Sequence, residues 1–385
     1  MPAEQNSAQN SASPAGRTIF INGRFLGRPV TGVERFAGMI LREIDASLSP
    51  ADAGRFVVLA PQSVSRPAWL RHVAFRNVGR LNGHAWEQTE LWQASRAGVL
   101  VNLCNSGPVL HGRQLTVLHD ALVYRHPENF SRAYGSFHRL LGRFLSRRAN
   151  LATVSDFSRK ELSKLLGVSA GSIGIVPNAV DHMLGVEPDV SVLERFDLTN
   201  RPFFLFVGSP ANNKNLANAI RAFVALGRPD VALVMVGGAA ATFARSLLGD
   251  LPANVISTGR LTDEEIQALY GRAAALVFPS IYEGFGIPPL EAMALGCPVI
   301  AGDIPVVREV CADAVLYFDP YNVASITSVM HQVVDGSVDM AAVRDRGFAR
   351  IKAFSWKSSA EKLVALVKAV DRTNRISDQS GEGAR

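Results

Sequence analysis

The sequence is poor in cysteine, with only Cys104, Cys297 and Cys311 among its 385 residues. Because three is an odd number and their spacing matches no zinc motif, we expect buried, reduced thiols and neither disulfides nor a metal site. No run approaches the roughly 20 consecutive apolar residues that a membrane-spanning helix needs. The start, residues 1–16, lacks the basic and apolar parts of a secretory signal, which favours a disordered tail on a cytoplasmic protein.

Charge is moderately one-sided, with 40 basic against 34 acidic residues. A net charge of +6 favours anionic partners, such as nucleotide diphosphates, lipid phosphates, an acidic membrane or nucleic acid, and charge alone does not choose among them. The densest basic stretch, Ser131–Arg148, alternates arginines with Phe and Leu at helical spacing. It predicts an amphipathic helix that is either half-buried with solvated arginines or faces anionic lipid or a lipid-linked acceptor. No nucleic-acid-binding motif accompanies it.

The apolar residues that are present recur in short runs, each followed by a stretch with helical spacing. This alternation predicts an α/β fold with parallel sheets and crossover helices. Six runs fall in each half of the chain: 18–21, 56–60, 99–103, 115–118, 151–154 and 173–176, then 203–207, 232–236, 255–257, 275–278, 298–301 and 315–318. The chain length also suits two cores rather than one.

We therefore expect two facing Rossmann-like domains with a cleft between them. The expected boundaries are a disordered tail at 1–16, an N-terminal domain at 17–182, a C-terminal domain at 183–355, a C-terminal helix at 356–371 that packs back toward the N-terminal domain, and a second disordered tail at 372–385. Ligands of such sheets bind beyond the carboxyl ends of the strands, so the loops after the apolar runs are the candidate sites.

The loop and helix from Ser280 to Gly296 carry the strongest signal. Prolines suit the first turn of a helix and a glycine suits its end, so a short helix is predicted after a glycine-rich loop. The free N–H groups of its N-terminus would attract an anion such as a diphosphate. Glu283 and Glu291 flank this terminus and could accept hydrogen bonds from sugar and ribose hydroxyls. The alternative is that Glu283 interacts with the helix dipole and Glu291 forms a surface ion pair.

The stretch Pro-Ser-x-x-Glu-Gly-Phe-Gly-x-Pro-Pro-Leu-Glu-Ala-Met-Ala-x-Gly-x-Pro-Val resembles the signature of glycosyltransferase family 4. That family has the GT-B fold, retains the sugar's anomeric configuration, needs no essential metal, and holds the donor mainly on the C-terminal domain. The resemblance implies that Glu283 contacts the transferred sugar and Glu291 the ribose. It places the backbone of Gly284, Phe285 and Gly286 against sugar hydroxyls and phosphates.

Other segments resemble the same family in the same order, from about Ile19 to the helix after Trp356. They include Thr31-Gly32-Val33-Glu34-Arg35, in which Gly32 could approach a phosphate, Gly83-His84-Ala85-Trp86-Glu87-Gln88, and Val176-Pro177-Asn178-Ala179-Val180-Asp181. A strand ends in His119 and Asp120. A neutral His119 could donate to a sugar hydroxyl or donor oxygen and Asp120 could engage an acceptor hydroxyl. The alternative is a histidine that hydrogen-bonds its own loop. Ser155 and Asp156 are expected to cap the next helix.

The family's diphosphate grip falls at Phe206–Asn215. Lys214 matches it, whereas Ser209 and Asn213 stand where many relatives carry arginine or another polar residue. The grip would thus rely on Lys214, backbone N–H groups and the helix dipole. Arg260 would lie near the base or phosphates, or be merely exposed.

The resemblance implies a retaining, metal-independent hexosyltransferase of surface-polysaccharide assembly that uses a nucleotide sugar, with GDP-mannose the first choice. UDP-glucose, UDP-N-acetylglucosamine and dTDP-rhamnose stay open. No Asp-x-Asp motif in a strand-end loop suggests metal-dependent donor binding, so no cofactor is expected. The expected acceptor is a glycan or lipid-diphosphate-linked glycan, with peripheral contact to the inner membrane face. The alternatives are a GT-B-fold UDP-sugar epimerase and a scaffold or binding protein with weakened catalysis.

Overall fold

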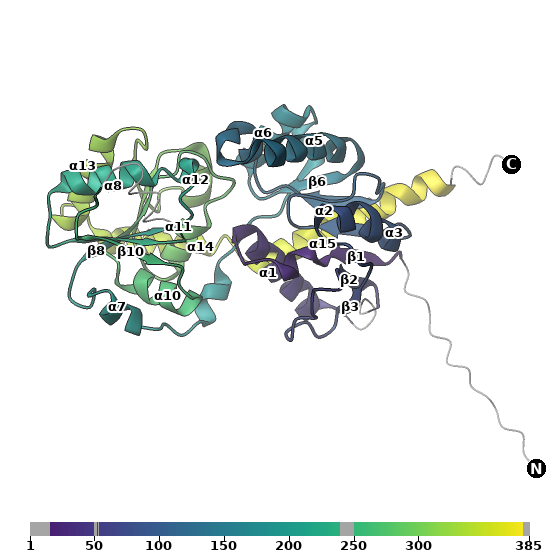
Figure 1. Ribbon diagram of the computed structural model, residues 1–385, viewed down its shortest axis with the longest axis horizontal. Coiled ribbons are helices and arrows are strands. Elements are labelled where there is room, and N and C mark those ends of the chain that lie inside the picture. Colours follow the sequence, from purple (N-terminus) through teal and green to yellow (C-terminus); the bar gives the residue numbers. More distant parts are fainter. Residues whose placement is uncertain (1–15, 50–51, 53, 239–249, 380–385) are drawn as a thin grey trace, which may run out of the picture.

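A computed structural model of the chain describes residues 16–49, 52, 54–238 and 250–379. It shows two α/β domains side by side, one formed by the purple and blue first half and one by the teal and green second half (Figure 1). Each domain is built on its own parallel sheet, with helices on both faces. The predicted α/β class with two Rossmann-like domains is confirmed.

The first sheet has seven strands in the order β3-β2-β1-β4-β5-β6-β7. Every pairing is parallel, and the central strands are buried along their whole length because helices cover both faces. Its strands are β1 Ile19–Asn22, β2 Phe56–Ala60, β3 Ala74–Asn77, β4 Val99–Asn102, β5 Gln114–Val117, β6 Asn150–Thr153 and β7 Ile173–Ile175.

The second sheet has six parallel strands in the order β10-β9-β8-β11-β12-β13. In each sheet the strand order reverses beside the strand that comes first in the chain, because later strands are added on its other side. Such a switch point is where α/β sheets bind ligands. The strands are β8 Phe203–Val207, β9 Ala232–Val236, β10 Val255–Gly259, β11 Ala275–Phe278, β12 Val299–Gly302 and β13 Leu316–Phe318.

The helices follow the strands as the sequence pattern requires. Those of the first half are α1 Gly32–Ser47, α2 Gly83–Trp86, α3 Trp92–Ser95, α4 Leu122–Arg125, α5 Arg132–Arg148 and α6 Asp156–Leu166. Those of the second half are α7 Ser191–Arg195, α8 Leu216–Leu226, α10 Asp263–Arg272, α11 Ile287–Ala294, α12 Pro305–Cys311, α13 Val323–Val334, α14 Met340–Ile351 and α15 Trp356–Gln379. Short 3-10 turns at Gly23–Gly27, Pro127–Asn129 and Asn212–Lys214 lie near the cleft.

Helix α15 leaves the second domain and packs against α1, β4 and β5 of the first (Figure 1). The helix runs to Gln379, whereas the predicted helix ends at residue 371 and a tail begins at residue 372. Residues 380–385, and residues 1–15 of the other expected tail, lie outside the described residues. The chain therefore crosses between the domains twice, between β7 and β8 and again before α15.

Twelve strands were predicted and thirteen are described. The missed strand, β3, lies at the edge of the first sheet and reads Ala-Phe-Arg-Asn, with alternate residues exposed. Because only one face of it is buried, it lacks the apolar run that identifies central strands. The three cysteines are free thiols, two buried and one half-buried. No helix within the described ranges is long and apolar enough to cross a membrane.

Candidate active site

The loop after β11 places a glycine-rich turn at the start of α11. Pro288 and Pro289 occupy its first turn, and Gly286 precedes it with a φ of +106°, which a side chain would strain. The N–H groups of Gly284, Phe285 and Gly286 have no acceptor among the described residues. The Phe285 side chain is buried against Phe354, so only its backbone faces the cleft. These N–H groups and the helix dipole create a site that suits an anion.

Gly284 also has a role that the sequence did not indicate. A Cβ there would lie 2.4 Å from the carbonyl oxygen of His119, in the other domain. The Gly284 carbonyl also accepts hydrogen bonds from the hydroxyls of Ser155, at 2.7 Å, and Ser158, at 2.9 Å. Glycine at this position thus permits the two domains to meet, and it leaves the N–H of Gly284 as its remaining free backbone group.

Lys214 and Glu283 form an ion pair in the cleft, with 2.6 Å between Nζ and Oε1. Lys214 ends the Asn212–Lys214 turn after β8, and Glu283 follows β11, the neighbouring strand in the sheet. Both side chains are largely buried, at 20% and 12% exposure. The lysine predicted to bind the diphosphate and the carboxylate predicted to bind the sugar therefore contact each other directly.

His119 and Asp120 end the segment after β5, in the first domain, opposite this pair. Burial raises the pKa of Asp120, and the negative charge of Glu283 adds to the rise, whereas the Leu122 N–H and Lys214 oppose it. One oxygen of Asp120 accepts from the Leu122 N–H at 2.8 Å, which leaves the other for a ligand. Asp120 and Glu283 thus lie close enough across the cleft to influence each other's charge.

The hydrogen-bonding role expected for His119 is reversed by its surroundings. Its Nε2 lies 2.8 Å from the carbonyl oxygen of Leu103, and a carbonyl only accepts, so Nε2 carries the proton. Burial lowers the pKa of this imidazole to about 4, so it is neutral at pH 7 and its Nδ1 is an acceptor. Its ring packs edge-on against Phe36. His119 can therefore accept a hydrogen bond from a sugar hydroxyl, whereas the sequence suggested that it donates.

Glu291 lies within α11 and is almost fully buried. Burial raises the pKa of its carboxyl, while the charge of Arg35 and a 3.3 Å hydrogen bond from the Tyr270 hydroxyl oppose the rise. Arg35 comes from α1 of the first domain and binds both oxygens of Asp263, at 2.7 and 2.8 Å. The surface ion pair considered for Glu291 is thus absent among the described residues, and the buried carboxyl lies near Arg35 of the other domain.

The remaining predicted residues lie further from this centre. Gly32 abuts α11, since a Cβ there would lie 3.2 Å from Ile287 Cδ1. Ser209 and Arg260 are exposed and make no side-chain hydrogen bond within the described ranges. Ser155 accepts from the Ser158 N–H, as expected for a helix cap.

Asn213 does not face a phosphate site. It is buried, donates to the Tyr282 carbonyl at 2.9 Å, and accepts from the Asn129 amide at 3.0 Å. Asn129 belongs to the first domain and in turn accepts from the N–H of Asn212. Asn213 therefore joins the two domains, a role that its position in the sequence motif does not reveal.

Several residues of the site have no sequence signal of their own. Tyr282 contributes a hydroxyl that accepts from the Ala121 N–H at 3.3 Å, and Glu309 of α12 accepts from the first N–H groups of α6 at 2.7 and 2.8 Å. Both contacts join the domains. They depend on the relative placement of two folded units, which no local pattern encodes. No group of three His, Cys, Asp or Glu side chains in the described residues could hold a metal ion.

Residues 194–348 match the family model described as Glycosyl transferases group 1. The chain is 28% identical to O-antigen chain mannosyltransferase B of Escherichia coli over 267 residues, which cover 66% of this chain and 70% of that protein. It is 27% identical to O-antigen chain mannosyltransferase RfbU of Salmonella typhimurium over 344 residues, 82% of this chain and 90% of that protein.

Two solved structures share the architecture. Anabaena HepE, in complex with UDP and glucose, superposes with a TM-score of 0.71 at 16% identity, covering 92% of this chain and 100% of that one. WaaG, a glycosyltransferase involved in lipopolysaccharide biosynthesis, gives a TM-score of 0.67 at 17% identity over 91% of this chain and 99% of its own. The fold is therefore GT-B. The C-terminal domain is a glycosyl transferases group 1 domain, and the chain is a glycosyltransferase.

Proposed function

We propose that this protein is a retaining, metal-independent hexosyltransferase that transfers mannose from GDP-mannose to a glycan or lipid-diphosphate-linked glycan in polysaccharide biosynthesis. The observation that carries the proposal is the Lys214–Glu283 pair beside the free N–H groups that precede α11, opposite His119 and Asp120. The names of the relatives, mannosyltransferases of O-antigen chains, support the choice of sugar.

In this proposal the donor diphosphate lies against Lys214 and the N–H groups of Gly284, Phe285 and Gly286. The bond from the anomeric carbon to the diphosphate oxygen breaks while the acceptor oxygen bonds to the same face, and the acceptor proton passes to the departing phosphate. Preorganised donors stabilise the charge that develops on the leaving group. Lys214 supplies a full positive charge for this task, which favours a mechanism without a metal ion.

Glu283 and Glu291 are assigned to hydroxyl recognition, of the transferred sugar and of the ribose respectively. Glu283 would release Lys214 to the diphosphate and accept from sugar hydroxyls. His119 accepts from one more sugar hydroxyl through Nδ1, and the free oxygen of Asp120 accepts from the acceptor hydroxyl. Gly32, Ser209 and Arg260 complete the proposed donor site at its rim.

The proposed acceptor is held by the N-terminal domain, with α5 on the cytoplasmic face of the membrane. Three large side chains of α5 are exposed, Phe137, Leu140 and Phe144, at 41–53%. Arginines flank them along the same helix. An exposed apolar strip with neighbouring cations suits the surface of an anionic bilayer.

The test is an assay of purified protein with GDP-mannose, UDP-glucose, UDP-N-acetylglucosamine and dTDP-rhamnose, with and without EDTA. We expect release of GDP alone, unaffected by EDTA, and slowed at least tenfold by Glu283→Ala and by Lys214→Ala but not by Arg228→Gln, where the side chain is exposed. A different nucleotide released would change the donor. Product formation from the nucleotide sugar alone, as a UDP-sugar isomer, would support the epimerase alternative, and binding without turnover the scaffold.

A further inference from the structure

The N-terminal domain contains a cavity of about 620 Å³. Of the proposed donor site, only the loop around Gly32 adjoins it. Loops after β1, β2 and β4 line it, together with the start of α1, the start of α2, and α5. These are the carboxyl ends of the strands, so the cavity opens on the same edge of the sheet as the donor cleft. Its volume lies within the roughly 300–1,000 Å³ of pockets that bury drug-sized ligands, closer to a disaccharide than to a single hexose.

The cavity adjoins the proposed reaction centre through Asn105. This residue lines the cavity, and its side-chain oxygen accepts from the backbone N–H of His119 at 2.7 Å. Glu34, another lining residue, is close enough to act electrostatically on His119. A sugar bound beside His119 and Asp120 could therefore continue directly into the cavity.

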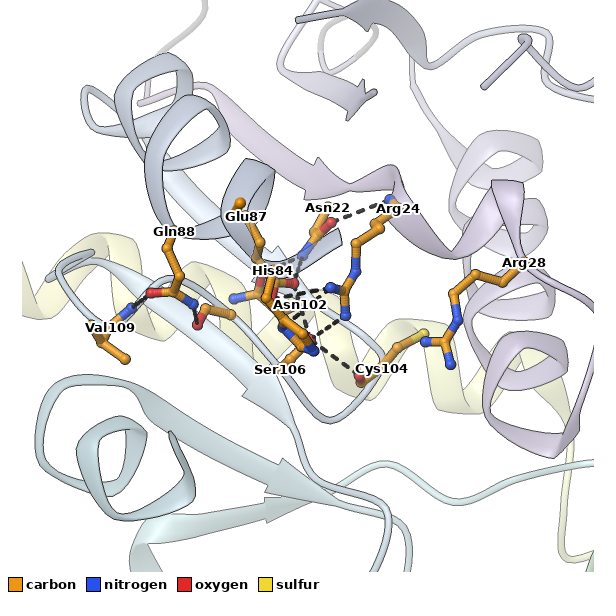
Figure 2. Close-up of polar contacts among 12 residues, drawn as sticks. Asn22, Arg24, Arg28, His84, Glu87, Gln88, Asn102, Cys104, Ser106 and Val109 are labelled. Atoms are coloured by element: carbon orange, nitrogen blue, oxygen red, sulfur yellow. Dashed lines mark hydrogen bonds and ion pairs between the residues drawn. The ribbon is translucent and has the colours of Figure 1, made fainter. Parts of the chain in front are cut away.

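A buried polar network fixes one wall (Figure 2). Glu87 is fully buried and accepts from Asn22 at 2.8 Å and Ser106 at 3.0 Å, while its other oxygen lies 3.1 Å from His84 Nδ1. Arg24 donates to Ser106 at 2.8 Å. Because each group holds another, Arg24 and His84 are oriented before any ligand arrives, and a preorganised wall binds with less loss of conformational entropy.

The charges of the cavity are balanced. Arg24 lies 3.7 Å from Glu87, and Arg28 lies 3.1 Å from Glu34, so each guanidinium has its own carboxylate. Burial, with the nearby charges of His84 and Arg24, lowers the pKa of His138 to about 4, so this lining histidine adds no positive charge at pH 7. An anion would have to break one of these pairs, whereas hydroxyls can bond to both members without doing so.

The part of the lining that adjoins His84 is aromatic. Tyr134 of α5 packs against His138 with 4.1 Å between ring centroids, and Phe130 stacks on Tyr134. Buried atom Nε2 of His138 has no hydrogen-bond partner within the described residues, which is a costly state. Aromatic rings beside paired charged groups match a sugar ring, which has an apolar C–H face and a polar rim.

We propose that this cavity binds uncharged sugar residues of the acceptor, those that precede the residue receiving the transferred sugar. The inference rests on the proposed function, because it takes the substrate to be a glycan. It assigns the charged phosphate of any lipid-linked acceptor to a place outside the cavity. It also makes the enzyme selective for acceptor length, since a single sugar would leave the cavity unfilled.

The test compares transfer to neutral methyl glycosides of one, two and three sugar residues, and to the same compounds carrying a phosphate on the residue farthest from the transfer position. We expect kcat/KM to rise at least tenfold from one residue to two or three, mainly through a lower KM, and the phosphate to cancel the gain. Ser63→Trp, which fills the cavity, and Tyr134→Ala should remove most of the length dependence. Gln62→Trp, an exposed neighbour outside the cavity, is the matched control and should retain it.

Equal kcat/KM for all lengths, a preference for the phosphorylated compounds, or transfer that Ser63→Trp does not affect would overturn the proposal. So would donor hydrolysis without transfer to any of these glycosides. Failure of the proposed function looks different, because no nucleotide sugar would then be turned over at all. In that case equilibrium binding of the neutral trisaccharide glycosides decides, and binding weakened at least tenfold by Ser63→Trp but not by Gln62→Trp would still support the cavity as a glycan site.

Discussion

The Lys214 amine, in the loop after β8, lies 2.6 Å from a carboxylate oxygen of Glu283, in the loop after the neighbouring strand β11. The lysine proposed to bind the diphosphate is therefore paired with the carboxylate proposed to bind the sugar. Donor binding must exchange this pair for two new contacts, from Lys214 to phosphate and from Glu283 to sugar hydroxyls. The two residues should then act as a unit.

Replacing Lys214 by alanine should lower kcat/KM for the donor by about 10- to 100-fold, because one charge-assisted hydrogen bond contributes about 1.5–3 kcal/mol. Glu283→Gln should cost a similar factor. The double variant should lose less than the product of the two single losses, since each substitution already removes the pair. Steady-state kinetics of the four proteins measures this coupling, and fully multiplicative losses would contradict it.

The neutral state of His119 gives a second prediction. Burial lowers its pKa to about 4, against about 6.5 in the unfolded chain, so between these values the unfolded state alone binds a proton. The free energy of unfolding should therefore fall as pH drops through this window. For this one residue the loss from pH 7 to pH 5 should be about 2 kcal/mol.

Urea unfolding at pH 7 and pH 5 measures that loss. His138 and His182, whose pKa values burial also lowers to about 4, add to it in the wild type. The comparison is therefore with His119→Gln, in which the loss should be smaller by about 2 kcal/mol. His72→Gln, at an exposed position, should keep the wild-type loss. If His119→Gln kept it as well, His119 would have an ordinary pKa in the folded chain.

The exposed strip of α5 predicts binding to anionic vesicles. Phe137→Ser combined with Phe144→Ser removes two exposed rings at 41% and 45% exposure and should reduce cosedimentation with vesicles that contain phosphatidylglycerol by at least tenfold, about 1.4 kcal/mol. Val224→Ser, an equally exposed apolar position on α8 of the other domain, is the control. Binding that is unchanged in the α5 variant would place the membrane contact elsewhere or nowhere.

How far the sequence predicts these features depends on whether they are local. The glycine loop and the proline-led start of α11 are local, and both Gly286 and Pro288 lie where the pattern indicates. The roles of Asn213 and Gly284 depend on contacts with the other domain. Sequence spacing therefore placed both residues in loops beside the cleft but gave no sign of these contacts.

His119 illustrates a different limit. Its place at the end of the β5 segment follows from the strand pattern, but the atom that carries its proton depends on the carbonyl of Leu103, sixteen residues earlier in the chain. A hydrogen bond between neighbouring loops leaves no trace in either segment alone. The edge strand β3 was missed for a local reason. A half-exposed strand needs no continuous apolar run, so its sequence carries only a weak signal.

The close approach of Gly284 to His119 gives the last prediction. A Cβ at position 284 would lie 2.4 Å from the His119 carbonyl oxygen and 2.8 Å from Asp120 Cβ, and backbone atoms cannot yield as a flexible side chain can. Gly284→Ala should therefore hold the domains apart. We expect kcat to fall at least tenfold, because His119 and Asp120 no longer reach the sugar, while each domain keeps its own core and the melting temperature changes little.

Gly38→Ala, in α1 with open space around it, should keep full activity and gain up to about 1 kcal/mol of stability. Small-angle scattering distinguishes an opened chain from an unfolded one, and a Gly284→Ala protein that is fully active and as closed as the wild type would show that the domains need not meet at this point.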